Sequence, residues 1–182
     1  MKIILISSIL FLLTNIANAK CFKIESSQLK WTAFKTADKK PVSGTFKSIK
    51  YPKQLDINSK GHFNLSVVVD TKTVDTKNSK RDVNLTTAFF ALFDNSIFVS
   101  MNAISNKKIN ATIKMNGKSM NIPFSYSKKS NSIEGKGKID LFKFALSSQL
   151  ARLTKKCFTA HEGKTWNDVS LEFKAKLISC SK

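Results

Sequence analysis

Apolar and polar residues alternate through most of the chain, with the two-residue period of a β-strand that buries one face. The pattern is clearest in HFNLSVVVD, where Phe63, Leu65, Val67 and Val69 share one face. The same alternation predicts eight strands, at roughly residues 22–35, 41–50, 63–69, 97–103, 109–115, 120–126, 132–140 and 169–177. Between the fifth and sixth, Asn116-Gly117 predicts a two-residue hairpin turn, because both residues readily adopt positive φ.

Two connections between strands show helical spacing instead. Between Arg81 and Phe93 the apolar residues recur every three or four positions, and Asp82 or Asn84 is the expected N-cap. Residues 146–158 repeat this spacing. We therefore expect two short helices, one between strands three and four and one between strands seven and eight, each covering a mouth of the sheet or lying across its wall.

One-faced antiparallel strands can stack as a sandwich or close into a barrel. Closure is favoured, because eight strands close around an interior that is either filled by side chains or holds one small ligand, and a closed sheet has no exposed edges. The sequence thus predicts an all-β fold, an eight-stranded antiparallel barrel with two helical inserts.

The chain contains three cysteines, Cys21, Cys157 and Cys180, so one thiol is left over whichever two pair. In an up-and-down barrel the first and last strands are neighbours, which places Cys21 beside Cys180. We expect those two to form a disulfide and Cys157 to be a buried thiol.

Residues 1–19 have the form of a secretory signal peptide, with Lys2 before an apolar run and Ala17-Asn18-Ala19 as the cleavage site. A lipoprotein is the alternative, because Cys21 lies near the cut, but Lys20 fits a lipobox poorly. Cleavage leaves residues 20–182, a length that suits one domain in an exported protein. Export also permits disulfides.

The formal net charge of +19 comes from lysines spread along the chain in ones and twos. A solvated basic surface is the simpler interpretation, and it would still attract anionic lipid headgroups. Nucleic acid is not an expected partner, because the protein is exported and residues such as Phe34 and Phe46 are predicted to face the interior rather than a stacking surface.

The sequence shows no recognisable catalytic or metal-binding motif. Its two histidines, His62 and His161, are far apart, and His161-Glu162 lacks the second histidine of a zinc protease motif. Gly135 and Gly137 form a G-x-G with no following helix to hold a phosphate. We expect no enzyme activity, metal or cofactor; turnover that depends on His161 or Glu162 would contradict this.

Fourteen phenylalanines and two tryptophans are more than a tightly filled small barrel obviously requires. From the pattern alone, a filled barrel and a barrel with an apolar ligand cavity remain equal alternatives.

Three segments resemble the YceI-like family: LKWTAFKTADKKPVSGTF, VDTKNSKRDVNLTTAFFALF and TWNDVSLEFKAKL. They occur in the family's order and span most of residues 20–182. The resemblance implies a lipocalin-like barrel in the periplasm, which encloses a long isoprenoid or fatty chain, and it is compatible with a homodimer. Two departures are the absence of a proline after the paired Phe89-Phe90 and a longer insert at residues 145–166.

On this resemblance we expect the bound lipid to contact apolar side chains of the strands and of the first insert, with Phe89, Phe90 and Phe93 forming an aromatic lid. The full predicted lining is Trp31, Phe34, Phe46, Phe63, Leu65, Val67, Leu85, Phe89, Phe90, Phe93, Met101, Ile113, Phe124 and Phe173. Arg81 is expected either to bind a phosphate or carboxylate headgroup or to pair with Asp82 or another acid.

The main alternative is a solid-core protein that binds acidic components of the cell envelope through its lysines. High salt would abolish that binding, whereas uptake of an apolar chain would barely respond to salt.

Overall fold

The computed structural model describes residues 19–92, 96–103, 105 and 107–180. The expected signal peptide lies outside the described residues except for Ala19, and Phe93 also lies outside them. Within the part of the chain that is described, no helix is both long and apolar enough to cross a membrane.

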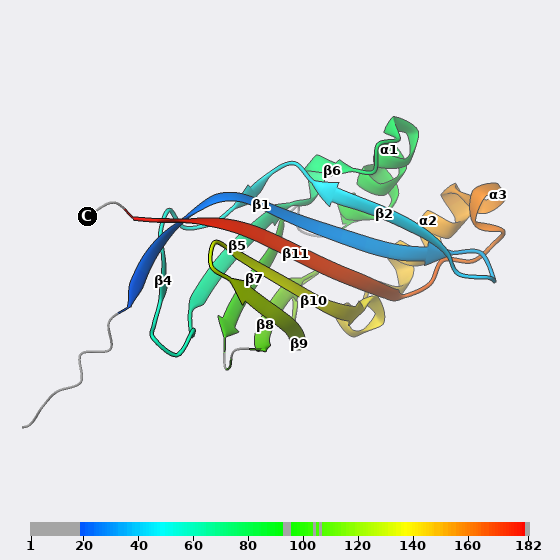
Figure 1. The fold of residues 1–182 in the computed structure, drawn as a ribbon. Coiled ribbons are helices and arrows are strands. Elements are labelled where there is room, and N and C mark those ends of the chain that lie inside the picture. The colour runs from blue at the N-terminus through cyan, green and yellow to red at the C-terminus, as the bar shows by residue number, and fades with distance from the viewer. Residues whose placement is uncertain (1–18, 93–95, 104, 106, 181–182) are drawn as a thin grey trace, which may run out of the picture.

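The described strands form one curled antiparallel sheet (Figure 1). Their spatial order is β3-β5-β7-β8-β9-β10-β11-β1-β2-β6, and β4 pairs with β1 outside this path. The strands are β1 (Lys20–Lys35), β2 (Lys40–Phe46), β3 (Ile49–Lys50), β4 (Leu55–Ile57), β5 (Asn64–Asp70), β6 (Val74–Asp75), β7 (Ser96–Ala103), β8 (Lys108–Met115), β9 (Lys118–Lys129), β10 (Ser132–Asp140) and β11 (Asp168–Ser179).

All eight predicted strands are present, one of them is divided, and the short strands β4 and β6 were not predicted. The second predicted strand breaks at Lys47 and Ser48 into β2 and β3, and the third is β5, after which the chain passes through the 3-10 turn η1 (Thr71–Thr73) into β6. Because β3 pairs with β5 and β2 pairs with β6, the same two chain segments meet at both ends of the strand order. Between these two strand pairs, the Lys47 N–H donates to the Thr73 carbonyl at 3.0 Å. The two segments therefore stay together along their length, and the sheet curls around the core.

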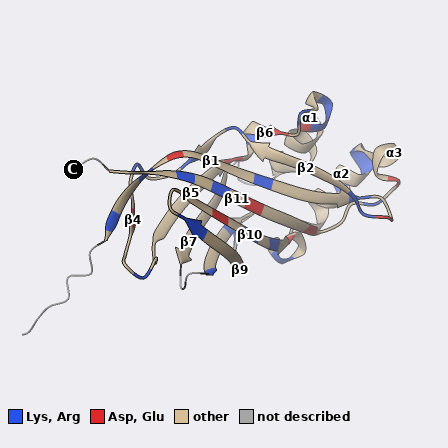
Figure 2. Ribbon diagram, in the orientation of Figure 1, with Lys and Arg blue, Asp and Glu red and all other residues tan. Residues whose placement is uncertain are grey.

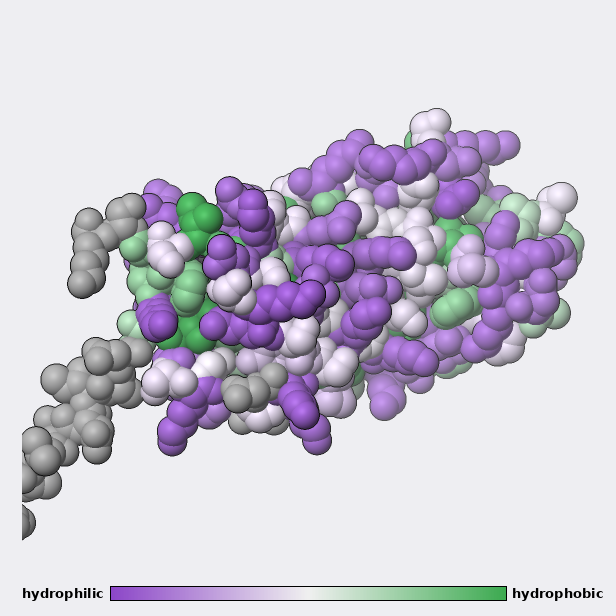
Figure 3. Space-filling view, viewed as in Figure 1, coloured by the Kyte–Doolittle hydropathy of each residue, from purple (hydrophilic) through white to green (hydrophobic). Residues whose placement is uncertain are grey.

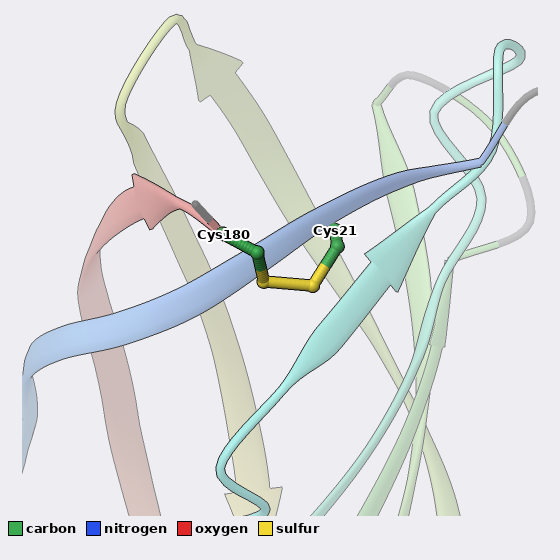
Figure 4. The surroundings of a disulfide bond; sticks show 2 residues. All are labelled: Cys21 and Cys180. Carbon is green, nitrogen blue, oxygen red and sulfur yellow. A yellow bond between two sulfur atoms is a disulfide. The ribbon is translucent and has the colours of Figure 1, made fainter. Parts of the chain in front are cut away.

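The two ends of the long β1–β11 pair are covalently joined. Cys21 and Cys180 form the predicted disulfide, with their Cα atoms 5.4 Å apart (Figure 4). The Cys180 N–H also donates to the Cys21 carbonyl at 3.1 Å. Cys157 is the free cysteine, but the prediction that it is buried is wrong: the residue lies at the junction of α2 and α3 and is half-exposed.

The predicted hairpin joins β8 to β9, with φ of 51° at Asn116 and 70° at Gly117. β8 shows the alternation fully, because every second residue from Ile109 to Met115 is buried. The Asn116 side-chain amide donates to the Phe144 carbonyl at 2.9 Å and ties the hairpin to the 3-10 turn η3 (Leu141–Phe144).

Both helical inserts are present and lie at the same end of the sheet, opposite the C-terminus (Figure 1). The first forms α1 (Ser79–Ala88) and the 3-10 turn η2 (Phe90–Leu92), and the second forms α2 (Ser147–Lys156) and α3 (Phe158–His161). Helices α1 and α2 contact each other. The inserts therefore cover one mouth together rather than one mouth each.

The predicted N-cap of the first helix is wrong. Asn78 caps α1, with its side-chain oxygen accepting from the Arg81 N–H at 2.9 Å. The Asp82 carboxylate accepts instead from the N–H and hydroxyl of Thr76, at 2.9 and 2.6 Å. Asp82, in the first turn of α1, therefore holds the segment that precedes the helix through two hydrogen bonds to Thr76.

Candidate ligand-binding site

The curled sheet encloses an apolar cavity, which we call the bore. Its volume is about 190 Å³, and its walls are almost entirely apolar side chains of the strands, α1, η2 and α2. One water-sized group needs about 10–15 Å³ of such space, so the bore has room for about a dozen methylene-sized groups. The described side chains therefore leave an apolar hollow inside the sheet, as the barrel with a ligand cavity requires.

Most of the predicted lining residues line the bore. They are Trp31, Phe46, Phe63, Leu65, Val67, Leu85, Phe89, Phe90, Met101, Ile113, Phe124 and Phe173. The placement of Phe34 in the bore is wrong. Trp31 and Ala33 of β1 line the bore, and neighbouring side chains of a strand point to opposite faces, so Phe34 does not line the bore but lines a second cavity.

Other residues that line the bore were not predicted, although some of them follow the periodic pattern of their strand or helix. Val99, Ala111 and Leu171 share a face with predicted residues of their own strands, and Leu150 and Leu153 follow the helical spacing of the second insert. Other missed residues lie outside the periodic segments, where the sequence gives no such signal; they include Tyr51 and Trp166.

Aromatic rings at the end of the first insert line the bore. The Phe89 and Phe90 side chains are buried, and their ring centroids lie 5.1 Å apart in an edge-to-face arrangement. The Phe90 ring makes a second edge-to-face contact with Phe46 of β2 at 5.9 Å. Edge-to-face pairs of this kind add about 0.5–1.5 kcal/mol beyond the burial of their area. The end of the first insert thus adds two packed aromatic rings to the wall of the bore, and Phe93, the third residue of the expected lid, lies outside the described residues.

The G-x-G of β10 has a packing role. A Cβ atom on Gly135 would lie 2.2 Å from the Phe173 ring, and one on Gly137 would lie 2.7 Å from the Phe124 ring. Both rings line the bore, with centroids 6.2 Å apart. The glycines therefore let two large rings lie directly on the backbone of the neighbouring strand.

A second cavity of about 420 Å³, which we call the vestibule, lies between β1, α1, α2 and α3. It shares the lining residues Trp31, Ala33, Leu85, Leu153 and Thr165 with the bore. The segment after α3 is held beside β1 by the Trp166 N–H, which donates to the Phe34 carbonyl at 3.0 Å. The vestibule therefore adjoins the bore at the helical end of the sheet.

Four cationic residues line the vestibule: Lys35, Lys80, Arg81 and Lys156. Among the described residues that line it, none is Asp or Glu. Arg81 forms no salt bridge with any described residue, and the carboxylate of neighbouring Asp82 faces Thr76. The expected alternative of an Arg81–Asp82 ion pair is therefore not found.

His161 also lines the vestibule, half-buried, with Nδ1 2.7 Å from the Thr165 hydroxyl. Burial lowers the pKa of His161 below its usual value, and the nearby charges of Lys35 and Arg81 lower it further. Cys157 lies in the same cavity, where its sulfur accepts from the Asn84 side-chain amide at 3.3 Å. Among the described residues, no group of His, Cys, Asp and Glu is arranged to hold a metal ion.

A family model for the YceI-like domain matches residues 22–177. Among solved structures, the chain is similar to a polyisoprenoid binding domain from Saccharophagus degradans implicated in plant cell wall breakdown, with 12% identity, coverage of 87% of this chain and 98% of that chain, and a TM-score of 0.62. It is also similar to Burkholderia cenocepacia BcnA, with 13% identity, coverage of 82% of this chain and 95% of that chain, and a TM-score of 0.60.

The chain is also similar to the Campylobacter jejuni YCEI protein, with 20% identity, coverage of 78% of this chain and 86% of that chain, and a TM-score of 0.59. At these identities the similarity to solved structures shows the fold. No curated protein matches the chain.

Proposed function

The chain belongs to the YceI-like domain family, and from that premise we propose that it is a periplasmic carrier that holds one long apolar chain in its bore without catalysing a reaction. The ligand class we propose is a polyisoprenoid or a fatty-acid-like lipid. The observation that carries the proposal is the hollow bore, lined by apolar side chains at the centre of a curled sheet. The polyisoprenoid binding domain from Saccharophagus degradans, which shares the fold, supports this ligand class.

Burial of the chain supplies the binding free energy in this proposal. Each buried methylene contributes about 0.8 kcal/mol, so ten of them approach about 8 kcal/mol before the cost of ordering the chain is subtracted. The bore has room for about a dozen such groups, so a longer lipid would extend into the vestibule. Side chains with reactive groups are not needed for this kind of binding.

Native mass spectrometry of gently purified protein, followed by organic extraction, tests the proposal directly. We expect one long-chain lipid per chain. A Val67→Phe substitution replaces a small side chain that lines the bore with an aromatic ring, and it should reduce the amount of bound lipid severalfold. Val68→Phe is the matched control, because Val68 does not line either cavity. Lipid-free protein in repeated gentle preparations, or equal lipid in both variants, would contradict the proposal.

We further propose that the helical end of the molecule contacts an anionic membrane surface. Two large apolar side chains are exposed there, Val83 of α1 at 59% and Phe158 of α3 at 66%. Basic residues lie on α1 and on α2, the helix that precedes α3 (Figure 2), and apolar atoms lie between hydrophilic ones at this end (Figure 3). Exposed apolar groups combined with basic residues favour binding to anionic bilayers.

Cosedimentation with vesicles tests this contact. We expect binding to vesicles that contain phosphatidylglycerol and little binding to purely zwitterionic vesicles. Phe158→Ser should weaken the binding severalfold, whereas Phe98→Ser, at an exposed residue of β7, should not. Equal effects of the two substitutions would argue for a diffuse interaction of the basic surface instead.

Two further parts of the proposal concern the mature protein. We propose export with cleavage after Ala19, which N-terminal sequencing of the protein from the periplasm would test. A homodimer, proposed from family likeness, is tested by light scattering of the purified protein.

A further inference from the structure

The charge of the vestibule is unbalanced. Lys35 and Arg81 line it as half-buried residues, and Lys80 and Lys156 line it as exposed ones. The acids nearest in sequence have other partners: the Asp82 carboxylate bonds to Thr76, and the Glu162 carboxylate lies 3.8 Å from the Lys40 ammonium. The described salt bridges include none of the four vestibule cations.

Donors of these cations remain available for a ligand. The Lys35 ammonium donates to the Ala160 carbonyl at 2.8 Å, which uses one of its three donors and holds the side chain across the vestibule. The Arg81 backbone N–H is capped by Asn78, but the capping bond leaves the guanidinium uninvolved. Guanidinium and ammonium groups together bind the oxygen atoms of phosphates and carboxylates well.

The cavity beside these cations adjoins an apolar one. Trp31, Ala33, Leu85 and Leu153 line both the vestibule and the bore, so an apolar surface runs from the cationic residues to the interior of the sheet. A molecule that fills both cavities needs a charged head and an apolar tail. We propose that the vestibule binds the oxyanion head, such as a phosphate, of a single-chain amphiphile whose tail lies in the bore. This inference rests on the proposed function, because the tail needs the bore.

The pKa of His161 responds to the charge in the vestibule and can be used to measure it. The positive charges of Lys35 and Arg81 disfavour its protonation. A bound oxyanion would offset those charges and raise the pKa of His161. The only other histidine of the sequence, His62, lies outside both cavities and serves as an internal control in the same NMR titration.

The test compares dodecyl phosphate with dodecanol, which has the same tail and a neutral head, by isothermal titration calorimetry on delipidated protein. We expect both to bind, with dodecyl phosphate tighter by roughly tenfold or more, because a hydrogen bond to a charged group contributes about 1.5–3 kcal/mol. Dodecyl phosphate should also raise the pKa of His161, and dodecanol should not.

A double variant, Arg81→Gln with Lys156→Gln, should remove most of the preference for dodecyl phosphate over dodecanol. The matched control is Lys107→Gln with Lys129→Gln, which removes the same net charge at residues that line neither cavity. Comparison of the two ligands on the parent protein decides the proposal even if the double variant folds poorly.

Three other outcomes of these experiments would each overturn one or both proposals. Equal affinity for the two ligands would overturn the headgroup site and leave the apolar carrier intact. Failure of both ligands to bind would overturn both proposals. If inorganic phosphate alone raised the pKa of His161 as strongly as dodecyl phosphate, the vestibule would be a site for a free oxyanion rather than for a lipid headgroup.

Discussion

The Phe173 ring of β11 lies directly over Gly135 of β10, so close that a Cβ atom on the glycine would be 2.2 Å from the ring. The two residues are paired across the strands. Because Phe173 lines the bore, the missing side chain of Gly135 sets how far the ring extends into the cavity.

Gly135→Ala should therefore push the Phe173 ring toward the bore. We expect a loss of about 1–3 kcal/mol in the free energy of unfolding, the usual cost of overpacking, measured by urea denaturation. The double variant Gly135→Ala with Phe173→Leu should recover part of that loss, because the smaller side chain makes room for the added methyl group. Strictly additive effects would show that the two residues are not coupled.

Removal of the Cys21–Cys180 disulfide should strongly destabilise the fold. The two cysteines are separated by 159 positions, and on the chain-entropy model the bond contributes about 5 kcal/mol for a loop of that length. We expect the double variant Cys21→Ala with Cys180→Ala to unfold at a much lower urea concentration. Cys157→Ser is the control and should change stability little, since Cys157 is half-exposed and free. A small effect of the double variant would show that the pairing of β1 with β11 is sufficient alone.

Phe90→Asp should reduce lipid uptake at least tenfold. Phe90 is 7% exposed and packs against Phe46 and Phe89 over the bore, so the substitution places an unpaired carboxylate among apolar side chains. Phe142→Asp introduces the same charge at a residue that is 54% exposed and lines neither cavity. Displacement of a fluorescent fatty acid measures both variants, with circular dichroism as the check on folding. Normal uptake by folded Phe90→Asp protein would contradict a role of the Phe90 ring in lipid binding, and with it the expected aromatic lid.

The strands were predictable because each buries one face and exposes the other. That period identifies Phe63, Leu65 and Val67 as neighbours on an inner wall without any knowledge of the fold. The Cys21–Cys180 pairing followed from closure of the sheet alone. The break at Lys47 and Ser48 was not predicted although the two-residue period slips there: Phe46 and Ile49, three positions apart, both line the bore, and tertiary pairing decides where the strand bends.

The vestibule was not predictable from local pattern. Its lining comes from three chain segments, around Lys35, Arg81 and Lys156, which meet when both inserts fold over the same end of the sheet. Their arrangement depends on the contact between α1 and α2. The paired basic residues Lys80-Arg81 and Lys155-Lys156 were visible in the sequence, but their proximity is a tertiary property.

The stability of the protein should depend on pH through His161. Burial and the charges of Lys35 and Arg81 lower the pKa of this imidazole in the folded state, whereas the unfolded chain titrates near 6.5. Below about pH 6.5 the unfolded state therefore binds a proton that the folded state does not. The free energy of unfolding should fall as the pH decreases from about 6.5 to the folded pKa, by at most about 1.4 kcal/mol per pH unit, and His161 should add no slope above about pH 7.

Carboxylates act in a separate, more acidic range. The Asn167 side-chain amide and the Phe142 N–H lower the pKa of Asp140 below its usual value, so the stability from that carboxylate is lost only as the pH falls below about 3.8. Urea denaturation between pH 7 and pH 5 thus isolates the histidine. His161→Gln should flatten the slope in this interval. A slope that survives His161→Gln would mean that another group in the folded protein takes up the proton.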